Sequence, residues 1–350
     1  MQARMVTFRS GIKTAVADLL ADADMTCAQT EEALIALVVA LADLREEGAQ
    51  LFPRLVICDD LEEFLKVVQG TSPLTLGTGP RVPSTIARGL KKCAPLADEG
   101  WAIWVSRGEQ NFTYGVFRRP ASPTSLDLRS TLLDMPAEPS LHALTIAQFA
   151  PGRVEVVAAG QPVLRIHMSG ERADLDSPEG QSALVKRWSH DITDDRLRSS
   201  FASFAARLLL DLLRKGHGAL IAVVEAGVNP HNFVEDAVIL DEPVDLAALV
   251  EEHAESGSSE ALSELLDYSG LLAGMLGSDG IVLLDSVGRV LAFNWFVKTD
   301  LASLSARDQQ GGARHRAFGA LSALTREGTL RGVFIRSSDG GESAFEGSPS

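Results

Sequence analysis

Cysteine is scarce in this sequence, and its few residues form no pattern. Cys27, Cys58 and Cys93 are odd in number and widely spaced. A disulfide framework needs paired cysteines and a zinc site needs closely spaced ligands, so we expect neither. Unpaired thiols fit a reducing compartment, and we therefore expect a cytoplasmic protein.

Long apolar runs are also lacking. No stretch reaches the roughly 18 to 20 residues that a membrane-spanning helix needs, and the N-terminus lacks the apolar core of a signal peptide. The closest candidate, residues 33–44, is short and contains Asp43, which indicates a buried helix instead. We expect no association with a membrane.

Positive charge is in short supply. Lys and Arg total 32 against 47 Asp and Glu, which gives a formal net charge of −15. Such a chain repels a polyanion unless one face gathers its arginines. The balance argues against nonspecific nucleic-acid binding. It does not argue against a nucleotide, because a small local cluster of cations is enough to bind one.

The sequence does contain enough material for two domains of ordinary size. Its 350 residues are 45% hydrophobic and 23% charged, which is typical of a soluble globular protein. A polar, acidic connection over residues 169–178 places the boundary between residues 170 and 195. We expect an α+β domain over residues 1–180 and a second domain over residues 195–346.

Apolar spacing and turn residues predict the elements of the first domain. The expected elements are helices at 11–20, 30–48, 61–68 and 86–96, a strand at 51–58, a hairpin with strands at 101–105 and 112–117, and a meander with strands at 144–149, 154–158 and 162–168. Residues 70–83 are rich in Gly, Pro and Thr and are expected to form a surface loop. The aromatic residues of the hairpin have two interpretations, a sheet core or a ligand-stacking surface.

The most informative stretch lies between Ser278 and Arg316. Residues 278–293 hold two apolar runs around an Asp-Ser-Val-Gly turn, which predicts a hairpin. From Gly311 onward, two glycines and two arginines precede apolar residues at helical spacing, so they fall at a helix N-terminus. Unpaired N–H groups, close backbone approach at glycine and the planar guanidinium fork all favour a phosphate there.

An acidic residue heads the predicted hairpin. Asp279 could hold a divalent metal or orient a hydroxyl for attack on phosphorus. Asp-Gly is also a common turn pair, so Asp279 taken alone has a purely structural alternative. Together with the arginines, it suggests phosphoryl or nucleotidyl chemistry.

These segments resemble the diadenylate cyclase (DAC) domain. Asp279-Gly280-Ile281 and Arg314-His315-Arg316 are similar to the Asp-Gly-Ala and Arg-His-Arg motifs of that family, at about the same separation. Residues 215–225 look like its first strand, and residues 332–341 look like its last strand and turn. The resemblance extends from Asp195 to Glu346 and implies an α/β fold with a mixed, twisted central sheet flanked by helices.

The resemblance also implies roles for the motif residues. Asp279 would bind Mg²⁺ or Mn²⁺ and activate a ribose 3′ hydroxyl, while Arg314 and Arg316 would contact phosphates. Residues two apart on a helix point about 200° apart, so both arginines reach one phosphate only if Arg314 precedes the first turn. The other implied nucleotide-binding residues are Gly280, Gly312 and His315. For His315, packing beneath the site is the alternative.

The implied reaction condenses two molecules of ATP, or of another nucleoside triphosphate, into a cyclic dinucleotide and releases pyrophosphate. Each domain would hold one nucleotide, so two protomers would meet face to face as a homo-oligomer. The N-terminal domain would then be a regulatory or sensor domain.

Several positions depart from the family pattern. Ile281 replaces alanine, Ala313 replaces threonine, and Arg336-Ser337-Ser338 occupies the place of a Ser-Glu-Glu run. A phosphate-binding hydroxyl and a metal-binding carboxylate are thereby lost, although Asp339 or Glu342 could substitute. These changes favour an alternative, a catalytically degenerate nucleotide or cyclic-dinucleotide sensor. A pure interaction scaffold is a third interpretation. The tail from Glu342 onward is expected to be frayed.

Overall fold

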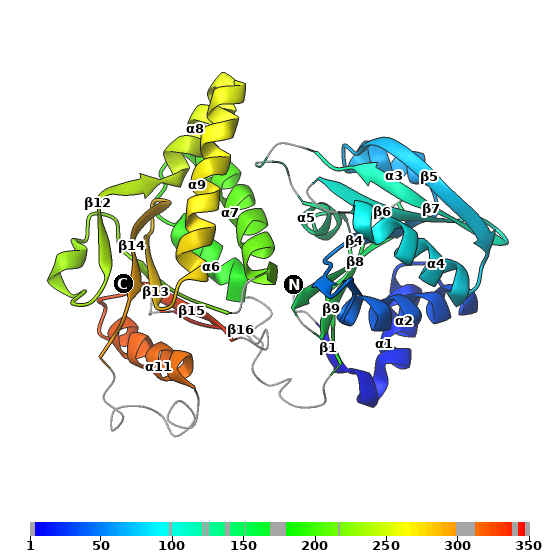
Figure 1. Cartoon of the computed structure of the whole chain (residues 1–350), viewed down its shortest axis with the longest axis horizontal. Helices are drawn as coiled ribbons and strands as arrows, with labels where there is room; N and C mark the ends of the chain where they lie inside the picture. Colours follow the sequence, from blue (N-terminus) through cyan, green and yellow to red (C-terminus); the bar gives the residue numbers. More distant parts are fainter. Residues whose placement is uncertain are drawn as a thin grey trace. The chain divides into compact units, whose positions relative to one another are not determined.

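The chain forms two compact units in the computed structural model. It describes residues 4–97, 100–120, 123, 125, 127–136, 141–150, 152–168, 180–215, 218–298, 312–337 and 342–346. Unit 1 is Met1–Ala121 with Ser125–Asp174, and unit 2 is Ser122–Thr124 with Leu175–Ser350. Each unit has a mixed sheet, helices on both faces and its own hydrophobic cores (Figure 1). Within the described part of the chain, no helix is long and apolar enough to cross a membrane.

Unit 1 is built on an eight-stranded sheet with the order β1-β10-β9-β8-β4-β6-β7-β5. Its strands are β1 (Arg4–Thr7), β4 (Arg54–Cys58), β5 (Thr71–Pro80), β6 (Trp101–Arg107), β7 (Asn111–Arg118), β8 (Ala143–Ala150), β9 (Arg153–Ala158) and β10 (Leu164–His167). Its helices are α1 (Phe8–Asp22), α2 (Ala28–Ala42), α3 (Leu61–Val67), α4 (Pro83–Cys93), the short η1 (Ala94–Leu96) and α5 (Leu128–Leu133). The predicted hairpin and the predicted antiparallel meander are both confirmed.

The two faces of this sheet carry separate cores. Helices α1, α2 and α4 cover one face, and α3 and α5 cover the other (Figure 1). Strand residues alternate between the faces, as the period of a strand requires. The hairpin aromatics follow this rule, because Phe112 and Tyr114 join the first core while Trp104 and Phe117 join the second. All four are at most 2% exposed, so they form a sheet core and not a ligand-stacking surface.

The expected surface loop over residues 70–83 is wrong, because most of it forms the edge strand β5. Proline is tolerated at a sheet edge, where its missing N–H is not needed for a second neighbour. Glycine has a packing role here. A Cβ on Gly77 would lie 2.5 Å from the Tyr114 hydroxyl, and one on Gly115 would lie 1.8 Å from the Leu74 carbonyl oxygen. The glycines that made this segment look like a loop therefore allow β5 and β7 to pair closely.

The second helix ends earlier than expected. Helix α2 stops at Ala42, and the residues up to Gln50 form a small hairpin of β2 (Arg45–Glu46) and β3 (Ala49–Gln50). Its two-residue turn consists of Glu47 and Gly48, which both have positive φ, at 50° and 86°. That is the requirement of a type I′ turn, so Gly48 marks a hairpin and not a helix end.

A buried ion-pair cluster lies on the second face of the unit 1 sheet. Glu155 of β9 accepts from Arg129 Nε at 2.5 Å and from Arg165 Nε at 3.1 Å. Glu155 and Arg165 are both below 10% exposed. Burial alone would raise the pKa of Glu155, but the charges and hydrogen bonds of the two arginines outweigh it, and the pKa is lowered.

Unit 2 is built on a six-stranded sheet with the order β12-β14-β13-β11-β15-β16. Its strands are β11 (Ala219–Val224), β12 (Val238–Asp245), β13 (Ile281–Asp285), β14 (Arg289–Trp295), β15 (Gly332–Arg336) and β16 (Glu342–Glu346). Its helices are α6 (Gly180–Trp188), α7 (Asp195–Lys215), the short η3 (Pro230–Asn232), α8 (Leu246–Ser256), α9 (Ser259–Gly277) and α11 (Ala313–Arg326). The predicted hairpin over residues 278–293 is confirmed as β13 and β14.

Helices cover both faces of this second sheet. Helices α6 to α9 pack on one face, and α11 packs on the other (Figure 1). Strands β11 and β13 are parallel, and the other pairs are antiparallel. The mixed α/β architecture expected for the second domain is therefore present in unit 2. Unit 1, which was expected to be an α+β domain, also has a mixed sheet with helices on both faces.

The expected frayed tail is wrong for residues 342–346, and residues 347–350 lie outside the described residues. Residues 342–346 form β16, which pairs with β15 along its whole length. Glu342 is 1% exposed, and its Oε1 accepts from Arg336 Nη1 at 2.7 Å and from Gln181 Nε2 at 2.8 Å. A buried ion pair thus holds the strand in place. The expected connection over residues 169–178 and the candidate ligand Asp339 lie outside the described residues.

Candidate functional site

The two motifs of unit 2 meet at one end of its strands, beside the amino-terminal end of the interior strand β13. Asp279 lies between the end of α9 and the start of β13, and Arg314 lies in the first turn of α11. The Arg314 Nη2 atom is 3.9 Å from Asp279 Oδ1. The Asp279 side chain is 89% exposed and that of Arg314 is 38% exposed, so the pair is accessible from solvent.

The end of α9 anchors the chain just before Asp279. Ser278 caps the helix, with its N–H donating to the Gly274 carbonyl at 3.1 Å and its hydroxyl donating to the Met275 carbonyl at 2.6 Å. Asp279 therefore leaves a fixed helix end and not a free loop.

Gly280 holds the other side of Asp279. Its φ is +101°, and a Cβ at this position would lie 2.9 Å from the Cα and carbonyl carbon of Asn294 in β14. Any other residue would clash with that backbone and adopt an unfavourable conformation. The structure thus assigns Gly280 a packing role, and its predicted contact with a nucleotide stays a prediction.

Gly218 is a site residue that the sequence reasoning missed. It precedes β11 with φ +109°, and a Cβ there would lie 2.7 Å from the Arg336 carbonyl oxygen and 3.0 Å from Arg314 Nη1. Glycine at this position lets the guanidinium group of Arg314 approach the end of β15. The only local signal was a glycine immediately before an apolar strand.

The arginine motif lies inside the helix. Gly312 is the N-cap of α11, with extended backbone (φ −66°, ψ 178°) and no side-chain cap, and the Arg316 N–H donates to its carbonyl at 3.1 Å. Because α11 begins at Ala313, Arg314 and Arg316 both belong to the first turn and project in different directions. Arg314 is the one placed beside Asp279, while His315 and Arg316 are half-buried.

The departures from the family motifs have different structural consequences. Ile281 is 1% exposed and fills the core between the sheet and α11, where Phe318 also packs. The expectation that Glu342 replaces a lost carboxylate is wrong, because that side chain is buried against Arg336 and Gln181. Ala313 offers no hydroxyl at the helix start.

The residues present fit a divalent metal only as a partial site. Among the described residues, no group of three or more His, Cys, Asp or Glu side chains could hold a metal ion. Mg²⁺ in phosphate-transfer sites commonly takes one or two carboxylates and completes its coordination with phosphate oxygens and water. Asp279 can supply one carboxylate of such a set.

A different polar cluster lies at the opposite end of the strands, beyond the carboxyl ends of β11 and β13. The buried Ser286 hydroxyl donates to Asp191 Oδ2, and Arg331 pairs with Glu225 and with Asp191. Burial alone would raise the pKa of Asp191, but hydrogen bonds from Ser286 and His190 and the charge of Arg331 lower it. These contacts tie the α6–α7 connection to the sheet. The Asp279 site lies at the amino-terminal ends of β11 and β13.

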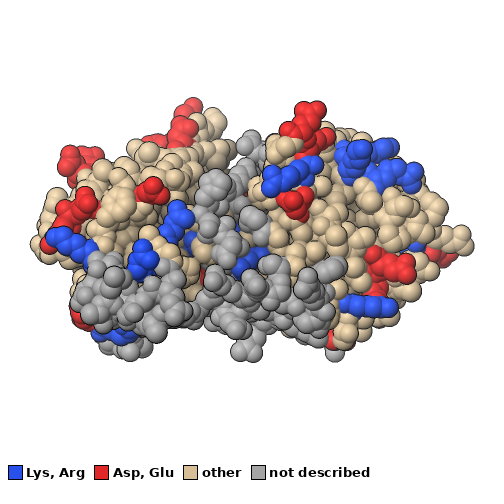
Figure 2. All heavy atoms as spheres, turned by 60° about the horizontal axis from the view of Figure 1, so that its bottom comes forward, with Lys and Arg blue, Asp and Glu red and all other residues tan. Residues whose placement is uncertain are grey.

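The face of the molecule in Figure 2 bears both signs of charge. The coloured Lys and Arg side chains form small separate groups, with Asp and Glu between them. A single guanidinium group at the start of a helix, such as that of Arg314, does not require a basic surface around it. The expectation that nucleic acid is not bound nonspecifically stays a prediction.

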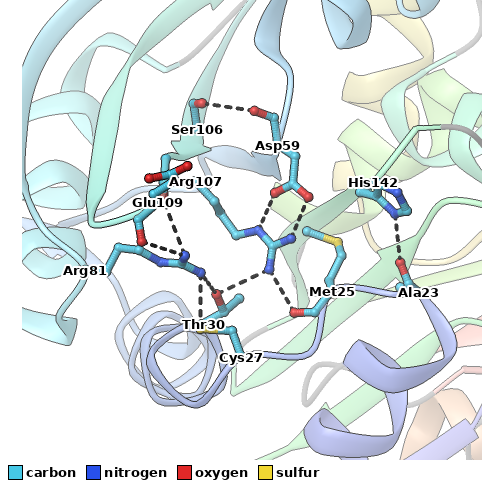
Figure 3. Close-up of polar contacts among 11 residues, drawn as sticks. Ala23, Met25, Cys27, Thr30, Asp59, Arg81, Ser106, Arg107, Glu109 and His142 are labelled. Carbon is cyan, nitrogen blue, oxygen red and sulfur yellow. Dashed lines mark hydrogen bonds and ion pairs between the residues drawn. The ribbon is translucent and has the colours of Figure 1, made fainter.

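Unit 1 contains its own polar cluster, where α2 begins and β4 and β6 end (Figure 3). Arg107 binds both oxygens of Asp59, at 2.6 and 2.7 Å, and donates to the Met25 carbonyl at 2.8 Å. Arg81 donates to the Thr30 hydroxyl at 2.9 Å. The two arginines thus join four segments that are distant in sequence.

Cys27 lies at the edge of this cluster as the N-cap of α2. Arg81 Nη2 is 3.2 Å from its sulfur, and the residue is half-buried. Partial burial alone would raise the pKa of the Cys27 thiol. Hydrogen bonds from Thr30 and Gln29 and the charge of Arg81 outweigh that effect and lower the pKa. Burial raises the pKa of Cys58 to about 12 and that of Cys93 to about 11.

We expect iodoacetamide to label Cys27 before the other two cysteines at neutral pH. Only the thiolate reacts, and the thiolate fraction at a given pH rises as the pKa falls. The labelling rate of Cys27 should reach half of its maximum below pH 9.0, the ordinary value for a thiol. Peptide mass spectrometry of timed samples across pH 6 to 10 measures this directly.

Two charge-removing variants test the cause. Arg81→Gln should shift the rate profile of Cys27 to higher pH, because it removes the neighbouring cation. Arg88→Gln removes an exposed charge on α4 and should leave the profile unchanged. Equal labelling of Cys27 and Cys93 in the native protein would contradict the expected order.

Comparison of the sequence with models of known protein families gives no match, and comparison with curated proteins gives none either. The fold and the site define the class only in structural terms. The chain is a two-unit mixed α/β protein whose second unit carries an exposed carboxylate beside an arginine at a helix N-terminus.

Proposed function

We propose that unit 2 binds nucleoside triphosphates at the Asp279–Arg314 edge and condenses two molecules of ATP into a cyclic dinucleotide of the c-di-AMP type. One observation carries this proposal. Two motif residues that are far apart in sequence bring a carboxylate and a guanidinium group to within 3.9 Å of each other at the start of α11. Similar motifs occur at a similar separation in diadenylate cyclases.

The roles of the residues follow from their chemistry. Arg314 and backbone N–H groups at the start of α11 would bind phosphate oxygens. Asp279 would accept the proton of a ribose 3′ hydroxyl, or share a Mg²⁺ or Mn²⁺ ion with the phosphates. A bound divalent ion would offset the negative charge of the triphosphate.

The reaction joins the 3′ oxygen of one nucleotide to the α-phosphorus of the other. The bond from that phosphorus to the bridging oxygen breaks, and pyrophosphate leaves. Two such steps close the ring, so two sites must face each other. The exposure of Asp279 is compatible with a facing protomer, and we propose a homo-oligomer that acts in the cytoplasm, with unit 1 as its regulatory or sensor domain.

The direct test is product formation. Purified full-length protein is incubated with each of the four nucleoside triphosphates and with Mn²⁺ or Mg²⁺, and cyclic dinucleotides are detected by mass spectrometry. Size-exclusion chromatography with light scattering establishes the oligomeric state. We expect a cyclic dinucleotide from ATP. No product from any nucleotide, with a folded dimer present, would reject the cyclase.

A nucleotide sensor is the second candidate, and a specific observation favours it. Ala313 provides no hydroxyl, and Glu342 is engaged in a buried ion pair, so the site has fewer phosphate and metal ligands than the family pattern. Calorimetry decides between the two. Binding of ATP or c-di-AMP without turnover would support the sensor, and binding of neither would remove it.

A further inference from the structure

Two register shifts interrupt the pairing of β13 with β14, and the first lies where β14 packs against Gly280. Ile281 pairs with Trp295 and Leu283 pairs with Ala292. An advance of two residues along β13 therefore corresponds to three residues along β14. This is the pattern of a β-bulge, in which one strand contains an extra residue. The extra residue lies between Ala292 and Trp295, directly opposite the start of β13.

Asn294 is the residue that makes the bulge possible. Its φ is +52°, and within the described part of unit 2 no other residue except glycine has a positive φ. Asparagine tolerates this left-handed conformation better than most residues, and β-branched residues tolerate it poorly. Bulges near functional sites often reorient a neighbouring segment.

The bulge is anchored on both sides. Before it, Ala292 and Phe293 pair with Ile239 and Val238 of β12. After it, Trp295 is buried and the Phe296 N–H donates to the Asp236 carbonyl at 2.8 Å. Because the segments on both sides are held, a change of backbone conformation at position 294 would displace the backbone of the bulge itself.

The displaced backbone would move Gly280. A Cβ atom on Gly280 would lie only 2.9 Å from the Cα and the carbonyl carbon of Asn294. The backbones of the two residues are therefore closely packed. Gly280 is covalently joined to Asp279, whose other neighbour, Ser278, is fixed to α9. The position of the Asp279 carboxylate therefore depends on two supports, the end of α9 and the bulge.

We propose that Asn294 is a positioning residue for Asp279. Its left-handed backbone, acting through Gly280, sets the place of the carboxylate relative to Arg314. The proposal rests on the proposed function, in which Asp279 and a divalent ion both act on a nucleotide. It assigns the effect to the backbone conformation of Asn294 and not to its carboxamide.

The test measures how strongly a metal ion aids nucleotide binding. Calorimetry gives the Kd of ATP for the full-length protein with Mn²⁺ and with EDTA. The ratio of the Kd in EDTA to the Kd with Mn²⁺ reports how much the metal ion aids binding, and its decrease in Asp279→Asn reports the share of Asp279. Supporting residues of metal sites typically change metal affinity about 10- to 100-fold. We expect Asn294→Gly to keep the wild-type ratio, because glycine adopts positive φ freely.

The other variants should lower the ratio of the two Kd values to different extents. Asn294→Ala should reduce it, and Asn294→Val should lower it about tenfold or more, toward the value of Asp279→Asn. The Kd in EDTA should change little, because Arg314 remains. Gln69 also has positive φ, at 54°, but lies in unit 1, so Gln69→Val introduces similar strain and should leave the ratio unchanged.

The possible results separate the two claims. A wild-type ratio near one would overturn the metal role of Asp279, and with it this inference. A high wild-type ratio that survives in folded Asn294→Val would overturn the positioning role alone. Loss of the ratio in Asn294→Gly would also overturn it, because the carboxamide would then be the active group. If Asn294→Val does not fold, the comparison of the glycine and alanine variants decides.

Discussion

Replacing Arg314 with alanine is expected to weaken ATP binding roughly 10- to 100-fold, since hydrogen bonds to charged groups contribute about 1.5 to 3 kcal/mol. The loss follows from the position of the guanidinium group at the start of α11, where it would bind phosphate. Loss of the Arg314–Asp279 pair itself should lower stability by at most about 1 kcal/mol, because the pair is solvent-exposed at 3.9 Å.

A matched control is available on the same helix. Arg326 lies in the last turn of α11, with its guanidinium group 4.9 Å from the ring of Phe345. Arg326→Ala removes the same charge from the other end of the helix and should leave the Kd of ATP unchanged. Calorimetry on both variants measures the difference. If Arg314→Ala binds ATP as tightly as the native protein, the nucleotide binds elsewhere.

Replacing Glu155 with glutamine is expected to lower the free energy of unfolding of unit 1 by about 3 to 5 kcal/mol, the usual cost of removing one member of a buried ion pair. The variant keeps the shape of the side chain but removes the charge that Arg129 and Arg165 share. Urea titration read by hydrogen exchange of peptides from β8 to β10 reports this unit separately from unit 2.

The same variant gives a pH signature. The pKa of Glu155 is lowered in the folded state, so its stabilisation is fully present above the ordinary value of 4.5 and is lost as pH falls through the lower folded value. The stability gap between the native protein and Glu155→Gln should therefore be constant near neutral pH and shrink below pH 4.5.

The control for this prediction is an exposed pair in the same unit. Glu62 and Lys66 on α3 are 2.9 Å apart, with side chains 83% and 71% exposed. Glu62→Gln should have a far smaller effect on stability, because exposed helical pairs contribute little. A loss at Glu155→Gln that is no larger than this would show that the buried cluster contributes little.

Local signals explain what could be predicted from the sequence. The hairpin of β13 and β14 was predicted from its Asp-Ser-Val-Gly turn, and the start of α11 from glycine followed by apolar residues at helical spacing. Each signal involves residues within a few positions of one another. The proximity of Asp279 and Arg314 was expected only from the family resemblance, because it depends on how α11 packs on the sheet.

Most features that were not predicted from the sequence depend on contacts between residues that are distant in sequence. Residues 70–83 and 342–346 have loop-like compositions, but strand pairing with β7 and β15 overrides that preference. The left-handed bulge at Asn294 and the close approach at Gly218 depend on neighbours distant in sequence. Helical periodicity across residues 30–48 likewise concealed a type I′ turn at Glu47 and Gly48.

The proline-containing edge of unit 1 has a consequence for self-association. Strand β5 is the last strand in its sheet, and Pro73 and Pro80 remove two N–H donors from it. Ser72, with φ +52°, further interrupts the regular rim. Intermolecular cross-β growth needs an unbroken row of donors and acceptors. On this side, a long exposed strand is therefore a poor template for amyloid-like stacking, even at high protein concentration.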